Sequence, residues 1–76
     1  MIIENLLRQL FPKAEFDASD PDLGIGSFPE WDSLGNFNFL MLVEETYQVR
    51  FSVDDMAELK TLGAIKERLR IFGVQT

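Results

Sequence analysis

The sequence predicts an all-α fold, a small four-helix bundle with three main helices, one short helix and a long loop between helices 1 and 2. Three observations support this prediction. Apolar residues recur at helical spacing in segments 2–11, 33–47 and 62–72. All three prolines fall between residues 12 and 32, where no regular element is convincing. The strand-like alternation at residues 48–53 has no second segment with which to pair.

The length and composition indicate one domain, spanning residues 1–76, with a single modest core. A hydrophobic content of 46%, with only three prolines and five glycines, is typical of a globular chain that folds unaided. Cysteine is absent, so disulfides and thiolate chemistry are excluded and the expected location is the cytoplasm. We expect no signal peptide and no membrane span, because no apolar run approaches the roughly 18 residues that a span needs.

The first predicted helix covers residues 2–11 and ends at Pro12. Its apolar face consists of Ile2, Ile3, Leu6, Leu7 and Leu10. The connection that follows, from residue 12 to residue 32, is long for a compact domain, so we expect it to pack on the core and to have a function. The side chains expected to pack are Phe16, Leu23, Ile25 and Phe28, with Trp31 as a plug that fixes the loop.

The second predicted helix covers residues 33–47, with Asp32 as a good N-cap. Around an ideal helix, at about 100° per residue, the broad arc assigned to the core holds Phe39, Leu40, Leu42, Val43 and Tyr47. A second, narrower apolar stripe holds Leu34, Phe37 and Met41. Burial of this helix on all sides would account for the second stripe. In a chain this small, however, two other full-length helices can cover only part of the helix surface. We therefore predict that the second stripe is an exposed docking surface.

The rest of the chain predicts a connector, a short helix and a last helix. Residues 48–53 form the connector, anchored by Val49, Phe51 and Val53, and residues 54–58 form one or two helical turns. Thr61 caps the last helix and Gly73 fits its C-terminal stop. The core-facing side chains of this helix are Leu62, Ile65, Leu69 and Phe72.

Charge is unevenly distributed along the chain. The net charge of −6 argues against a nucleic-acid partner, because phosphate backbones demand a basic surface. Between Ala14 and Val49 there are eight acidic residues and no lysine or arginine, whereas four basic residues cluster between residues 60 and 70. This polarity fits a solvated surface, and it also fits a negative face that attracts basic partners.

The composition also excludes most kinds of catalysis. Without histidine or cysteine, the chain cannot build a Ser-His or Cys-His pair, and the usual zinc ligand sets are missing. Gly24 and Gly26 do not complete a dinucleotide fingerprint, because Pro29 stands where the third glycine belongs. The acidic loop at residues 17–26 fails the EF-hand pattern, which requires a glycine where Ile25 stands. We expect neither an enzyme nor a metal site.

Ser33 directly follows Asp32 and opens the most apolar helix of the chain. A phosphate ester on its oxygen would lie at a helix N-terminus, where unpaired amides and the helix dipole favour negative charge. Serine is also among the commonest helix caps. Local physics therefore leaves a modification site and a simple cap both open.

A series of residues along nearly the whole chain matches a known pattern. In chain order these residues are Leu23-Gly24, Asp32-Ser33-Leu34, Glu44-Glu45, Tyr47, Phe51, Asp54-Asp55 and Thr61-Leu62. They resemble the acyl carrier protein family, in which a first helix and a long loop precede D-S-L. In that family an acidic pair and an aromatic residue end the second helix, and threonine caps the fourth.

The resemblance implies that Ser33 receives 4′-phosphopantetheine from a phosphopantetheinyl transferase that uses coenzyme A, with Asp32 as motif neighbour and cap. The thiol of this arm would carry an acyl or aminoacyl thioester, which suits a chain without cysteine. We expect a monomer that shuttles this cargo between loading and processing enzymes, which perform the catalysis. The residues implied in binding these partners are Leu34, Phe37, Met41, Glu44 and Glu45.

Three positions depart from the family pattern. Fatty-acid carriers usually place acidic residues just after D-S-L, where this chain has Gly35, Asn36 and Asn38. With Trp31 before the motif, the chain is more similar to a stand-alone carrier of a specialised pathway, aminoacyl or polyketide. The alternative function is an unmodified acidic adaptor that uses the second apolar stripe only to bind partner proteins and needs Ser33 only as a cap.

Overall fold

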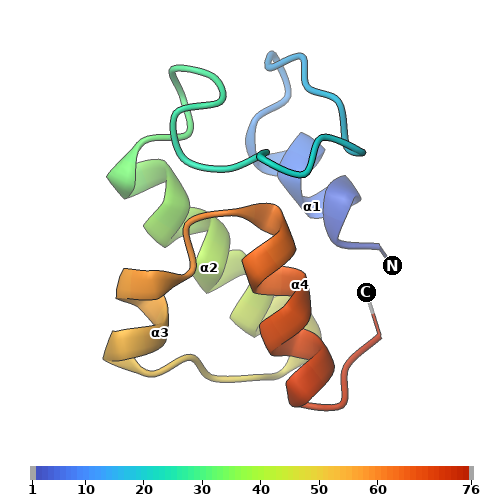
Figure 1. Ribbon diagram of the computed structural model, residues 1–76, viewed down its shortest axis with the longest axis vertical. Coiled ribbons are helices and arrows are strands. Elements are labelled where there is room, and N and C mark those ends of the chain that lie inside the picture. Colours follow the sequence, from blue (N-terminus) through green and yellow to red (C-terminus); the bar gives the residue numbers. More distant parts are fainter. Residues whose placement is uncertain (1, 76) are drawn as a thin grey trace.

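The computed structural model describes residues 2–75 and consists of helices joined by loops (Figure 1). The helices are α1 (Ile3–Leu10), α2 (Ser33–Tyr47), α3 (Val53–Glu58) and α4 (Leu62–Ile71). Residues 2–75 contain no β-strand, and Gly24 and Thr61 form an isolated antiparallel bridge. The predicted all-α class is therefore confirmed. No helix of the part described combines the length and the apolar character needed to cross a membrane.

One hydrophobic cluster joins buried side chains of α1, α2 and α4 with those of the loop before α2. Figure 1 shows this loop crossing the end of the molecule at which α2 begins, with α3 and α4 toward the opposite end. The largest side chains with almost no solvent exposure are Trp31, Phe39, Ile3, Leu6, Leu7, Leu40, Ile65, Leu69 and Val43. The core face predicted for residues 33–47 is confirmed for its central members, while Leu42 and Tyr47 are partly buried against the cluster.

Helix α1 is one residue shorter at each end than predicted. Its N-cap, Ile2, is 49% exposed and does not belong to the buried face. At the other end the backbone N–H of Phe11 donates to Leu7 O at 2.9 Å, and Pro12, which has no N–H to continue the ladder, follows.

The loop before α2 packs largely as predicted. Leu23, Phe28 and Trp31 are buried, and Phe16 is partly buried against the cluster. The prediction for Ile25 is wrong, because its side chain is 37% exposed. Ile25 instead uses its backbone: its N–H donates to Lys60 O at 2.9 Å, and the chain then turns at the next residue, a glycine with φ of 90°.

The connector between α2 and α3 is anchored by fewer side chains than predicted. Phe51 is buried and Val49 is partly buried, but Val53 is 84% exposed and is not an anchor. Val53 is the first residue of α3, which starts one residue earlier than predicted because Ser52 and Asp55 form a capping box. The backbone geometry of this cap, and not burial, determines where Val53 lies.

Helix α4 begins as predicted, with the Thr61 side chain accepting a hydrogen bond from the Ala64 N–H at 3.1 Å. Gly73, with φ of 84°, follows the helix end as predicted. The prediction that Phe72 faces the core is wrong, because this residue is the C-cap and is 42% exposed. Its ring lies over one edge of the cluster, with its centroid 6.0 Å from that of Phe51.

Candidate functional site

The candidate site is the first turn of α2, which Asp32 holds in place. Asp32 has extended backbone geometry, and its side chain accepts a hydrogen bond from the Gly35 N–H at 2.8 Å. Its carbonyl oxygen accepts from the Asn36 N–H at 2.8 Å. Asp32 is thus the N-cap of α2, as predicted, and Ser33 is not the cap.

Ser33 is the first residue of α2 and its side chain is exposed to solvent. Within residues 2–75, neither its hydroxyl nor the backbone N–H groups of Ser33 and Leu34 make a hydrogen bond. These N–H groups belong to the helix N-terminus, where unpaired amides and the dipole favour an anion. The exposure of Ser33 leaves room for a phosphate ester on its oxygen, and the unpaired N–H groups of the helix end favour the negative charge of such an ester.

The second apolar stripe of α2 is exposed. Leu34 is 68% exposed, Phe37 44% and Met41 48%, while Phe39 and Leu40, on the other face, are completely buried. This confirms that α2 has two distinct faces, and burial of the helix on all sides is excluded. The exposed stripe begins next to Ser33 and continues for two turns along α2.

The two glutamates at the end of α2 differ in their surroundings. Glu44 is half-buried, and its Oε2 accepts a hydrogen bond from the Phe51 N–H at 2.6 Å, which ties the connector to α2. Glu45 is exposed. Sequence reasoning missed the structural role of Glu44, since it depends on a backbone group that only the fold brings near.

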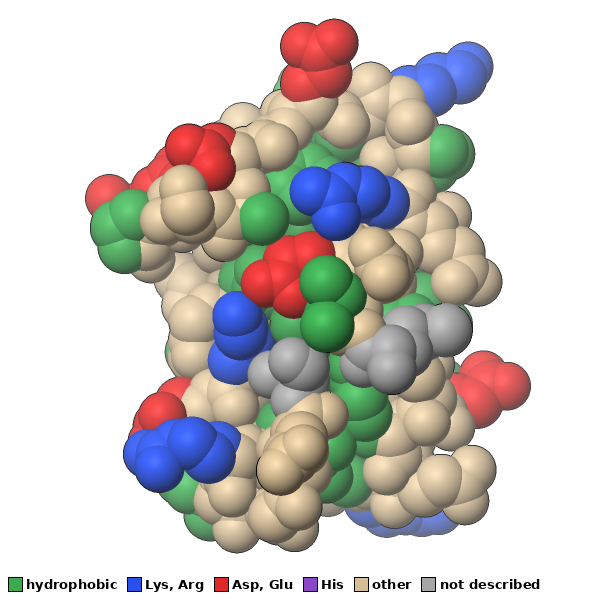
Figure 2. All heavy atoms as spheres, turned by 90° about the vertical axis from the view of Figure 1, so that its right-hand side faces the viewer, with side chains coloured by type: hydrophobic (Ala, Val, Ile, Leu, Met, Phe, Trp, Pro, Cys, Tyr) green, Lys and Arg blue, Asp and Glu red, His purple; other side chains and the backbone are tan. Residues whose placement is uncertain are grey.

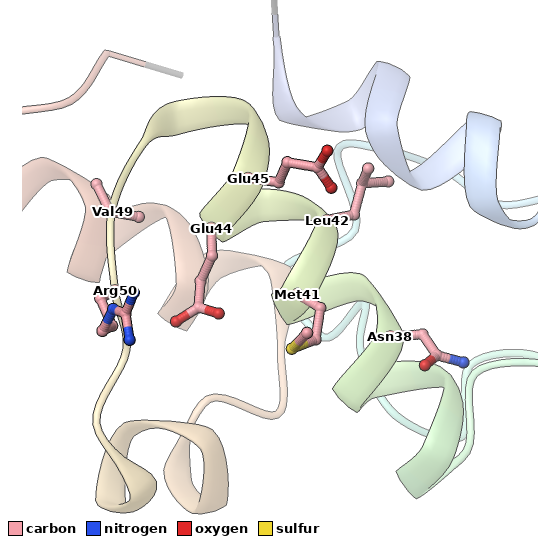
Figure 3. Close-up of a pocket in the computed structure, with 7 residues that line it drawn as sticks. All are labelled: Asn38, Met41, Leu42, Glu44, Glu45, Val49 and Arg50. Carbon is pink, nitrogen blue, oxygen red and sulfur yellow. The ribbon is translucent and has the colours of Figure 1, made fainter.

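A shallow groove runs between the end of α2 and the connector (Figure 3). Its lining residues are Asn38, Met41, Leu42, Glu44, Glu45, Val49 and Arg50. Figure 3 shows the carboxylate of Glu44 and the guanidinium of Arg50 extending into the same space. The acidic end of α2 therefore shares this groove with a cation of the chain itself.

The two residues after Leu34, Gly35 and Asn36, are buried. A Cβ atom on Gly35 would lie 2.3 Å from the Glu30 carbonyl oxygen, so this helical position requires glycine. Asn36 is only 3% exposed and has hydrogen-bond partners on both sides of its amide. Asn38 alone, of the three positions that depart from the family pattern, lies on the surface.

In the part of the chain described, three basic side chains are paired with acidic ones outside the candidate site. Lys66 Nζ lies 3.0 Å from Glu4 Oε2, linking α4 to α1. Partial burial raises the pKa of Glu4, but the hydrogen bond from Lys66 and the nearby cations outweigh it, so this pKa lies below its ordinary value. Arg68 pairs with Asp55 and Arg70 pairs with Glu67. Figure 2 shows basic and acidic side chains interspersed over one face of the molecule.

Residues 2–75 contain no group of three or more side chains that could hold a metal ion. In comparisons with protein-family models, curated proteins and solved structures, no match to this chain was found. Any function therefore has to be argued from the residues and geometry of the chain itself.

Proposed function

We propose that the chain is a carrier protein whose Ser33 bears 4′-phosphopantetheine and that it shuttles acyl or aminoacyl thioesters between partner enzymes. The observation that carries this proposal is the exposed hydroxyl of Ser33 at the tip of α2, beside an exposed apolar stripe. In this proposal the helices form the four-helix bundle of an acyl carrier, and the protein is a cytoplasmic monomer in a specialised pathway.

Attachment is a phosphoryl transfer in which Ser33 supplies the nucleophile. The Ser33 oxygen forms a bond to the phosphorus that carries pantetheine in coenzyme A, and the phosphoanhydride bond breaks. Adenosine 3′,5′-bisphosphate leaves with the bonding electrons, and in this proposal a base on the transferase takes the serine proton. When bound, the arm supplies the thiol that the chain lacks.

The second apolar stripe supports a role in transient docking. Burial of Leu34, Phe37 and Met41 against a partner contributes about 1.5–3 kcal/mol for each side chain. Association costs about 4–15 kcal/mol in lost freedom. Because the free energy gained by burial is close to the cost of association, the contacts are brief and weak. Such contacts suit a carrier that visits several enzymes. The partners are a phosphopantetheinyl transferase and the enzymes that load and process the cargo.

Intact mass tests the proposal. The chain is co-expressed with a broad-specificity phosphopantetheinyl transferase, and we expect a mass increase of one phosphopantetheine group, which Ser33→Ala abolishes. Because Asp32 is the cap, Ser33→Ala should leave thermal stability nearly unchanged, so the lost modification cannot be attributed to unfolding. An unchanged mass of the wild-type chain contradicts the carrier proposal.

The second candidate is the unmodified acidic adaptor. The exposure of Leu34, Phe37 and Met41 favours it equally, since a docking surface serves either function. The two candidates differ at Ser33: in an adaptor this residue is an ordinary first-turn serine, and its replacement by alanine leaves partner binding unchanged. A carrier with the same replacement keeps docking but loses its cargo.

A further inference from the structure

Asn36 is a buried polar residue one turn into α2 that the proposed function does not yet use. Its Oδ1 accepts a hydrogen bond from Trp31 Nε1 at 3.0 Å, and its Nδ2 donates to Leu59 O at 2.9 Å. Trp31 has no solvent exposure, and Leu59 is the C-cap of α3. One amide group therefore joins the loop before Ser33, the first turn of α2 and the end of α3.

The backbone is constrained both before and after Ser33. The Trp31 N–H donates to Phe28 O at 3.0 Å, and the Asn36 N–H donates to Asp32 O at 2.8 Å. Gly35 allows the Glu30 carbonyl to approach so closely that a Cβ would lie 2.3 Å from it. Ser33 itself is exposed, but Trp31 before it and Asn36 after it are buried in the core.

We propose that Asn36 is a positioning residue that sets the orientation of the α2 first turn and hence the direction in which the Ser33 hydroxyl is presented to a transferase. This inference rests on the proposed function, since Asn36 would hold in place the site at which Ser33 is modified. Loss of the Asn36 side chain leaves a buried indole N–H and a buried carbonyl without partners, so this segment must rearrange to satisfy them. Small displacements of a nucleophile lower its reaction rate strongly.

The test compares four variants of the full chain. Asn36→Ala removes both hydrogen bonds, and Trp31→Phe removes the indole donor and part of the ring volume while keeping an aromatic ring. Asn5→Ala, at an exposed position on α1, controls for the loss of an asparagine, and Ile65→Val controls for a modest loss of stability in the core. All are assayed at a temperature at which circular dichroism shows each of them folded.

Two readouts are measured. The first is the rate of modification by a broad-specificity transferase with coenzyme A, separated into kcat and KM. The second is amide hydrogen exchange of the α2 first turn by NMR, which requires no transferase. We expect Asn36→Ala to lower kcat about tenfold with a smaller change in KM. It should also speed exchange about tenfold at the amides of residues 35 and 36, whose N–H groups are hydrogen-bonded to Asp32. Trp31→Phe should give smaller changes in the same direction.

The outcomes separate this inference from the proposed function. If the wild-type chain is modified and folded Asn36→Ala reacts and exchanges at wild-type rates, Asn36 has no positioning role. An equal loss of rate in Ile65→Val shows a general stability effect and also overturns the inference. If the wild-type chain is not modified at all, the carrier proposal fails, and this inference fails with it. Should Asn36→Ala not fold, Trp31→Phe decides by the same two readouts.

Discussion

Replacement of Gly35 by alanine should destabilise the protein, although alanine is the better helix former. The new Cβ would lie 2.3 Å from the Glu30 carbonyl oxygen, far inside contact distance. Trp31, the next residue after Glu30, has no solvent exposure, so the carbonyl cannot retreat without disturbing the core. Overpacking costs about 1–3 kcal/mol, whereas replacing glycine gains about 0.4–1 kcal/mol. We expect a net loss of about 1–2 kcal/mol.

Gly63 provides the matched control, because it lies in the first turn of α4 and a Cβ there would meet nothing within 4 Å. Gly63→Ala should therefore stabilise the protein by about 0.4–1 kcal/mol. Thermal unfolding followed by circular dichroism measures the stability change of each variant, since 1 kcal/mol shifts Tm by about 4–8 °C in a domain of this size. If Gly35→Ala melts at or above the wild-type temperature, the steric account of the α2 first turn is wrong.

Two further predictions concern the faces of α2 and the link between α1 and α4. Phe37→Ala and Met41→Ala should each lower the free energy of unfolding, measured with urea, by no more than about 1 kcal/mol, whereas Phe39→Ala should lower it by about 3–5 kcal/mol. If all three variants lose the same amount, Phe37 and Met41 belong to the core. Glu4→Gln should weaken the acid dependence of stability. Because the folded-state pKa of Glu4 lies below its ordinary value of 4.5, its contribution is complete above that value and is lost as pH falls through the lowered pKa. Measured at a series of pH values, the free energy of unfolding should fall less steeply toward acid pH in Glu4→Gln than in the wild-type chain. If the two curves are parallel, the ion pair with Lys66 does not contribute to stability.

Sequence alone determined the features that depend on neighbouring residues. The periodicity of apolar residues predicted α1, α2 and α4 to within a residue or so at their ends, because a helix places residues three and four apart on one face. The caps Asp32 and Thr61 were predicted for the same reason, since a cap contacts backbone only three residues away. The exposed stripe beginning at Leu34 also followed from the helical period and the small size of the chain.

Only the tertiary structure decided which polar groups meet. Asn36 and Leu59 are 23 positions apart, and Lys66 and Glu4 are 62 apart, so no local pattern relates them. The sequence gives no sign that the Asn36 amide must satisfy the buried Trp31 indole. Burial in a chain this small is set by how the loop closes over the helices, and that closure depends on contacts between segments distant in sequence.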